Sequence, residues 1–130
     1  MAELDVRLVA SDRQIWQGPA TYVLARTLEG EIGILPSHEP VLALLDDGLV
    51  KINLAEGGEL RAAVHRGFLS VSGEEVAILA HTAELAGDID VARAEAALGR
   101  AQQAAANDEA AAEAMRRAEV RLEVAQAPRH

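Results

Sequence analysis

The stretch Gly87-Asp88-Ile89-Asp90-Val91-Ala92-Arg93-Ala94 divides the chain into two parts with different sequence patterns. Before it, apolar and polar residues alternate in short runs. After it, alanine dominates as far as Ala127, and Gly99 is the only glycine. Alternation with period two is typical of half-buried strands, whereas alanine has the highest helix propensity. The sequence therefore predicts an α+β protein, with a β-sandwich over residues 1–86 and an α-helical hairpin over residues 87–130.

Short alternating runs fill the N-terminal part. In the first run Leu4, Val6 and Leu8 fall on one face and polar residues fall on the other. Similar runs follow at short intervals, separated by turn-forming pairs such as Gly18-Pro19 and Ser72-Gly73. About ten short strands at this spacing predict an antiparallel sandwich or barrel.

Two antiparallel helices, about residues 89–105 and 109–125, are predicted for the C-terminal part. Asp88 is a natural N-cap for the first helix, which would place Asp90 in its first turn. Asn107-Asp108 offers the turn between the helices. The apolar stripes consist mainly of small residues, so the helices approach closely but bury little area. We expect a marginally stable hairpin, as a conformational switch requires. The stripes are Ala94, Leu98, Ala101 and Ala105 in the first helix and Met115, Ala118, Leu122 and Ala125 in the second.

Composition argues against several classes of protein. The net charge of −9 argues against a non-specific nucleic-acid binder, whose surface would be basic. The chain has no cysteine, so disulfides and thiolate metal sites are excluded. No signal peptide and no apolar run of roughly 18–20 residues is present, so we expect a soluble intracellular protein. The scattered histidines predict no metal site, and no nucleophile or acid–base constellation indicates an enzyme.

Four arginines of the helical part are spaced so that they could share one surface. Arg93 and Arg100 lie two helical turns apart, and Arg117 and Arg121 lie one turn apart. Reversal of the chain near Asn107 would bring all four within roughly a turn of one another. Neither Arg100 nor Arg121 has an acidic residue three or four positions away. Both a polyanion site and a set of solvated surface arginines are compatible with this geometry.

Several segments are similar to those of a known family. They are the opening strand and DRQIWQG (12–18), GEIGILPSHEP (30–40), GFLSV (67–71) and LAHTAE (79–84). Through them the chain resembles, over nearly its full length, the epsilon subunit of bacterial and chloroplast F-type ATP synthases. That resemblance implies an N-terminal β-sandwich and a C-terminal helical hairpin. One position departs from the family pattern, because Ser37 stands where the loop usually has glycine.

The resemblance also implies a regulatory nucleotide site. Family members that bind ATP carry an Ile/Leu-Asp-x-x-Arg-Ala signature, which residues 89–94 satisfy. The arginines would hold phosphates, and the acids would accept from adenine or ribose donors or orient Arg93. No P-loop is present, so ATP would be a regulatory ligand and not a substrate, and no cofactor is required. The implied ATP-binding residues are Glu84, Ile89, Asp90, Arg93, Ala94, Arg100, Arg117 and Arg121.

By the same resemblance the chain would be a non-catalytic central-stalk subunit that couples proton flow to ATP synthesis. Its sandwich would bind the gamma subunit and the rotor ring of c subunits, with Glu31 and His38 at that contact. An extended hairpin would reach into the alpha/beta catalytic head and inhibit ATP hydrolysis. The protein would lie peripherally on the cytoplasmic face of the bacterial plasma membrane. The alternative is a free-standing β-sandwich ligand-binding module with a helical oligomerisation tail; an enzyme is a remoter alternative.

Overall fold

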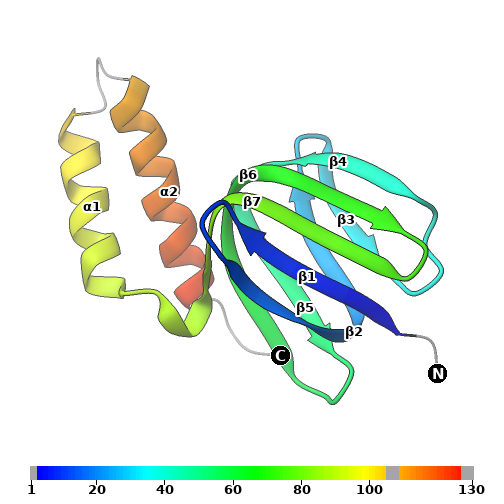
Figure 1. Cartoon of the computed structure of the whole chain (residues 1–130). Helices are drawn as coiled ribbons and strands as arrows, with labels where there is room; N and C mark the ends of the chain where they lie inside the picture. Colours follow the sequence, from blue (N-terminus) through cyan, green and yellow to red (C-terminus); the bar gives the residue numbers. More distant parts are fainter. Residues whose placement is uncertain (1–2, 105–108, 127–130) are drawn as a thin grey trace.

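The computed structural model describes residues 3–104 and 109–126, which form a β-sandwich followed by a pair of helices (Figure 1). The predicted class is confirmed, although the described residues form seven strands instead of about ten. The strands are β1 (Leu4–Ala10), β2 (Gln14–Thr27), β3 (Gly30–Ile34), β4 (Val41–Leu45), β5 (Gly48–Leu54), β6 (Glu59–Ser72) and β7 (Glu75–Leu85). A short 3₁₀ helix η1 (Ala86–Asp88) leads into α1 (Val91–Ala104) and α2 (Glu109–Gln126).

Two strands are longer than predicted, because alternating runs that were expected as separate strands, such as 60–65 and 68–71, are continuous. β2 and β6 contain 14 residues each. Gly18-Pro19 lies inside β2, just before an irregularity between Ala20 and Tyr22 in the pairing with β5. In β6, Arg66 and Gly67 have φ values of 53° and 142°, which bend the strand without ending it. These turn-forming residues therefore redirect long strands from one layer of the sandwich to the other.

The sandwich closes between its first and last strands. β1 pairs in antiparallel fashion with β2 and in parallel fashion with β7. Along β1, Leu4, Val6 and Leu8 are buried and the residues between them are exposed, as the alternation predicts. Ile34, Ile52 and other aliphatic residues complete the core between the layers.

The first long helix begins later than the sequence predicted. Asp90, not Asp88, is its N-cap, because the Asp90 carboxylate accepts a hydrogen bond of 3.0 Å from the backbone N–H of Arg93. Asp88 instead ends η1. Ile89 between them keeps an extended conformation, with φ −77° and ψ 124°, and is buried against Ala63 of the sandwich. Burial of Ile89 therefore delays the helix by two residues relative to the expected start.

The helices pack against each other through small residues, and α2 lies next to the sandwich while α1 lies outside it (Figure 1). Ala94, Ala101 and Ala118 of the predicted stripes are buried. Ala105 and the predicted turn at Asn107-Asp108 lie outside the described residues. Neither described helix combines the length and the apolar character needed to cross a bilayer.

A second, small hydrophobic cluster holds α2 against the sandwich. It consists of Ala63, Ile89, Val120 and Val124, and it is separate from the main core. Val120 and Val124 lie one turn apart and so share a helix face. The hairpin is therefore attached through few apolar side chains, which makes polar contacts important at this junction.

Candidate functional site

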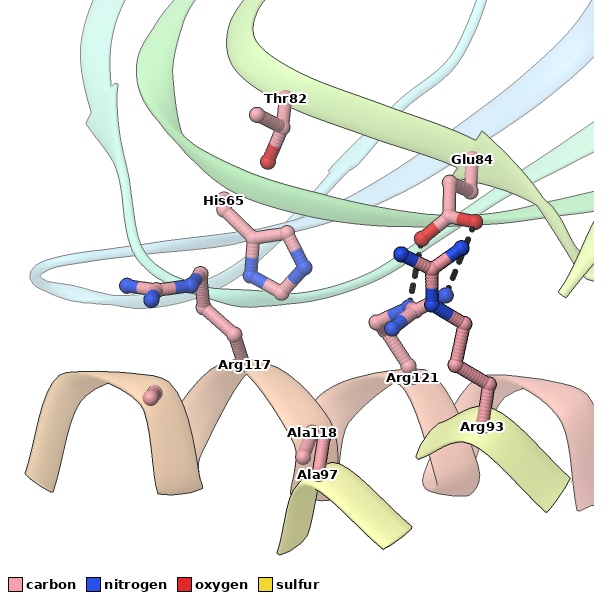
Figure 2. A pocket seen from close by; sticks show the side chains of 9 residues that line it. His65, Thr82, Glu84, Arg93, Ala97, Arg117, Ala118 and Arg121 are labelled. Atoms are coloured by element: carbon pink, nitrogen blue, oxygen red, sulfur yellow. Dashed lines mark hydrogen bonds and ion pairs between the residues drawn. The ribbon is translucent and has the colours of Figure 1, made fainter. Parts of the chain in front are cut away.

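A pocket lies at the junction of the sandwich and the hairpin (Figure 2). Its volume is about 410 Å³, and it is lined by residues of β6, β7, α1 and α2. The floor of the pocket consists of side chains of β6 and β7 that point away from the sandwich core. His65 pairs with Thr82 and Ala63 pairs with Glu84, so these side chains share one face of the sheet. Three arginines from the two helices, Arg93, Arg117 and Arg121, form the opposite wall.

An ion pair links the two walls of this pocket. The Nε of Arg121 lies 2.6 Å from Oε1 of Glu84, and its Nη2 donates a hydrogen bond of 3.2 Å to Oε2. Figure 2 shows the guanidinium group of Arg93 turned toward the same carboxylate. The lining thus carries three guanidinium groups and one carboxylate, a charge of +2 when His65 is neutral, and Arg117 points away from Glu84 toward Glu113, which lies outside the lining. Such a surface attracts an anion.

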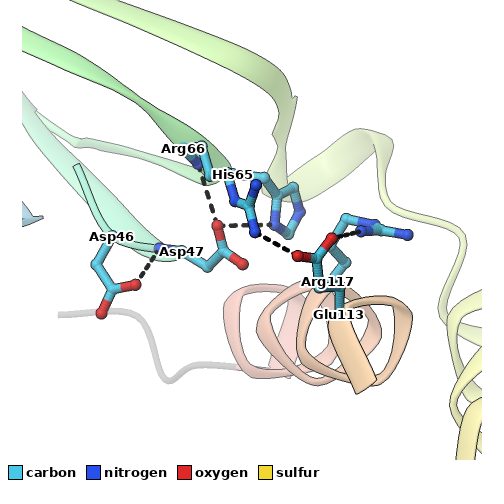
Figure 3. Close-up of polar contacts among 6 residues, drawn as sticks. All are labelled: Asp46, Asp47, His65, Arg66, Glu113 and Arg117. Atoms are coloured by element: carbon cyan, nitrogen blue, oxygen red, sulfur yellow. Dashed lines mark hydrogen bonds and ion pairs between the residues drawn. The ribbon is translucent and has the colours of Figure 1, made fainter. Parts of the chain in front are cut away.

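Two further ion pairs connect α2 to the sandwich. Nη2 of Arg66 lies 2.6 Å from Oε1 of Glu113, whose other oxygen is 4.0 Å from Nη1 of Arg117 (Figure 3). At the other end of α2, Nη2 of Arg26 lies 3.8 Å from Oε1 of Glu123. Both contacts are solvent-exposed, so each contributes at most about 1 kcal/mol to docking.

His65 is the buried polar residue of the pocket, with 5% of its surface exposed. Its Nδ1 has no hydrogen-bond partner and lies 3.9 Å from Oδ1 of Asp47, an oxygen that already accepts the backbone N–H of Arg66 at 3.1 Å (Figure 3). Burial lowers the pKa of the His65 imidazole below its usual value of 6.5. Asp47 and Glu84 oppose that shift, whereas Arg117 and Arg121 add to it.

The structure brings together half of the residues expected to bind ATP. Glu84, Arg93, Arg117 and Arg121 line the pocket. Arg100 is exposed and does not line it, because seven residues place it about 10 Å further along α1. The other three have local structural roles: Asp90 caps α1, Ile89 packs against the sandwich, and Ala94 is buried.

Sequence reasoning missed the two other polar residues of this pocket, His65 and Thr82, and the alanines that complete its lining. The alternation within β6 and β7 places His65 and Thr82 on the outer face of the sheet, where solvent would be expected. That face is instead covered by α2, so His65 becomes buried. One signal in the sequence could have indicated their role. The outward-facing side of β6 and β7 carries Ala63, His65 and Glu84, a mixture of small and polar residues.

The residues expected at the rotor contact lie in the sandwich and do not line the pocket. Glu31 is exposed on β3, and His38 lies in the loop that follows, with its Nδ1 2.7 Å from the carbonyl oxygen of Glu39. Ser37 in this loop has φ 68°, a conformation that favours glycine. Its backbone N–H donates to Oε1 of Glu74 at 3.0 Å, which ties the loop to the turn between β6 and β7.

An apolar row is exposed on the outer face of the sandwich. Leu44, Phe68 and Leu79 are cross-strand neighbours on β4, β6 and β7, and 43–51% of each is exposed. Leu42, two residues from Leu44 on the same face, is 76% exposed. A contiguous apolar patch of this kind is typical of a protein–protein contact.

Comparison with known proteins assigns the chain to a family. The family model described as "ATP synthase, Delta/Epsilon chain, beta-sandwich domain" matches residues 3–86. The ATP synthase epsilon chain of Streptomyces griseus is 51% identical over 121 residues, which cover 93% of this chain and 94% of that protein. That of Rhodococcus opacus is 56% identical over 99 residues, covering 75% and 81%.

A solved structure agrees with these matches. A chain in the Euglena gracilis mitochondrial ATP synthase (OSCP/F1/c-ring) superposes with a TM-score of 0.74 and 28% identity, covering 95% of this chain and 78% of that one. The relatives' names favour a synthase subunit over the alternative of a free-standing ligand-binding module. The chain belongs to the family of ATP synthase epsilon chains, subunits of the central stalk of that complex.

Proposed function

We propose that this chain regulates ATP hydrolysis by its synthase, and that ATP in the pocket holds the hairpin in the docked position seen here. One observation carries this proposal: the pocket is lined by both parts of the chain, so it exists only when the hairpin is docked. A ligand that binds only this form stabilises it by RT ln(1 + [L]/Kd), about 1.4 kcal/mol at roughly tenfold Kd.

The magnitude of that stabilisation is comparable to that of the contacts that hold α2. A small apolar cluster and a few ion pairs attach the hairpin. Loss of an exposed ion pair costs at most about 1 kcal/mol, and truncation of a buried side chain of the cluster costs on the order of 1–2 kcal/mol. ATP at a concentration tenfold above Kd would therefore shift the docking equilibrium substantially. A released hairpin would be free to reach the alpha/beta catalytic head and block ATP hydrolysis. In the docked state the subunit would couple proton flow through the rotor to ATP synthesis.

The test measures hairpin docking and ATP binding together. The chain has no cysteine, so a dye pair on cysteines introduced at the exposed positions Ser72 and Glu119 would report the distance between sandwich and α2 by energy transfer. We expect ATP to raise transfer and to give a calorimetric binding signal. Arg93→Ala should weaken ATP binding at least about tenfold, because it removes a charged contact to phosphate.

Two control variants separate the pocket from general charge. Arg116→Ala removes an arginine that is exposed on α2 and does not line the pocket, so ATP affinity should stay unchanged. Arg100→Ala should likewise have little effect, although the family resemblance would make Arg100 a ligand. Absence of any calorimetric signal with ATP, or an equal loss of affinity in Arg93→Ala and Arg116→Ala, would refute the proposed site.

The surfaces away from the pocket support contacts with the rest of the synthase. We assign the exposed row of Leu42, Leu44, Phe68 and Leu79 to contact with the gamma subunit, because burial of these side chains would remove apolar surface from water. Glu31 and His38 would face the ring of c subunits at the membrane, with the chain bound peripherally at its cytoplasmic face. Glu31→Lys should weaken coupling of proton flow to ATP synthesis; unchanged coupling would remove Glu31 from that contact.

A further inference from the structure

We propose that His65 is a further binding residue of the pocket and that it holds the phosphate groups of the ligand in its protonated form. This inference rests on the proposed ATP site and adds to it a residue that links nucleotide binding to pH. No other histidine lines the pocket among the residues that the structure describes.

The position of His65 fits this role. The ring lies on the pocket floor between Thr82 of the neighbouring strand and Arg117 of α2 (Figure 2). Arg121 and Arg93 line the same space, so an anion held by the arginines would come within reach of the imidazole. A phosphate binds most strongly to donors that carry charge, and a protonated imidazole has two N–H donors.

The hydrogen bonding of His65 is incomplete in the docked form. Nδ1 has no hydrogen-bond partner although the residue is 95% buried, and Asp47 at 3.9 Å is too far for a hydrogen bond. Buried polar groups without a partner are rare in folded proteins and call for an explanation. Protonation would give Nδ1 an N–H beside the Asp47 carboxylate and would leave Nε2 as the nitrogen available to an anion in the pocket.

The surrounding charges determine when His65 is protonated. Asp47 from the turn before β5 and Glu84 from β7 favour the charged ring, whereas burial and Arg117 and Arg121 from α2 disfavour it. The net result is a pKa below 6.5, so the ring is neutral near pH 7 without a ligand. Arg93 on α1 faces the same pocket and adds positive charge to it.

A polyphosphate would reverse this balance. Each terminal phosphate carries roughly −1.5 to −2 charge near pH 7, and a negative group beside an imidazole raises its pKa. The bound state would then hold a proton that the free state lacks. Between the two pKa values of His65, ATP affinity should rise as pH falls, by up to about tenfold per pH unit.

The test compares ATP binding by wild type, His65→Gln and His81→Gln from pH 8 to pH 6. Glutamine keeps a polar side chain without the titration, and His81 is an exposed histidine of β7 outside the pocket. We expect wild type and His81→Gln to gain affinity as pH falls and to take up a proton, seen as a binding heat that changes with the ionisation enthalpy of the buffer. His65→Gln should keep only the pH dependence of ATP itself and bind about tenfold more weakly at pH 6.

A second measurement covers the case in which His65→Gln misfolds. The His65 ring of the wild type can be followed by NMR during a pH titration with and without ATP, and with tripolyphosphate as a probe that lacks the nucleoside. Both ligands should raise the pH at which His65 titrates. An unshifted titration, or identical affinity of wild type and His65→Gln at pH 6, would overturn the role of His65 while leaving the ATP site intact. Failure of wild type to bind ATP at any pH would overturn both proposals.

Discussion

Replacement of Val124 by alanine should release the hairpin while leaving the sandwich intact. Val124 is fully buried in the small cluster with Ala63, Ile89 and Val120, apart from the main core. Two carbon atoms are lost, which costs about 1.6 kcal/mol of burial. The higher helix propensity of alanine opposes this by at most about 0.6 kcal/mol, which leaves a net loss of roughly 1 to 1.6 kcal/mol. The docking constant should therefore fall about five- to fifteenfold.

Energy transfer between dyes on the sandwich and α2 measures docking, and urea denaturation measures the stability of the sandwich. The matched control is Val6→Ala, which removes the same two carbons from the main core, where Val6 is also fully buried. Val6→Ala should lower the free energy of unfolding of the sandwich and leave docking unchanged. If Val124→Ala lowers sandwich stability as much as Val6→Ala does and leaves docking unaltered, the division into two independent clusters is wrong.

Three more predictions concern the strained loop, the bent strand and the buried histidine. Ser37→Gly should raise the thermal midpoint, because φ 68° costs a residue with a Cβ roughly 1–2 kcal/mol and glycine gives back about 0.5–1 in chain entropy; a lower midpoint would contradict this. Gly67→Ala should lower the free energy of unfolding of the sandwich by at least about 2 kcal/mol, since the new Cβ would overlap the carbonyl oxygen of Leu79. Gly99→Ala, in open space on α1, should instead stabilise its helix by up to about 1 kcal/mol. Without ligand, docking should weaken as pH falls below 6.5, because the docked form binds a proton at His65 less readily than the released form, and His65→Gln should flatten that profile; docking that is constant from pH 7.5 to 5.5 in wild type would refute this.

Periodicity predicted the class of fold because each strand buries only one face against the core. The alternation of Leu4, Val6 and Leu8 reappears as their burial in β1. Strand ends were harder to predict, since Gly18-Pro19 and Arg66-Gly67 form bends inside strands that pair with several others, β2 with β1, β3, β4 and β5 and β6 with β4, β5 and β7. A local pattern cannot distinguish a bend from a turn when the pairing with other strands decides which of the two forms.

The pocket could be predicted only in part, for the same reason. Arg121 has no acidic neighbour within one helical turn, but Glu84, 37 residues away, supplies its partner. Salt bridges within a helix follow from spacing, whereas this pair depends on how α2 lies on the sheet. The same docking buries His65, which the sequence places on an outward-facing position, and leaves Arg100 exposed.

The pairing of the first strand with the last one has a consequence for how the protein is made. β1 cannot complete its contacts until the ribosome has produced β7. The sandwich therefore cannot close before nearly all of its own residues have been synthesised. At about 5–20 residues per second, the 41 residues from Leu85 to Gln126 take roughly another 2–8 s to synthesise. All seven strands are therefore synthesised before α2, and α2 is the last described element to join the surface that carries Glu84 and His65.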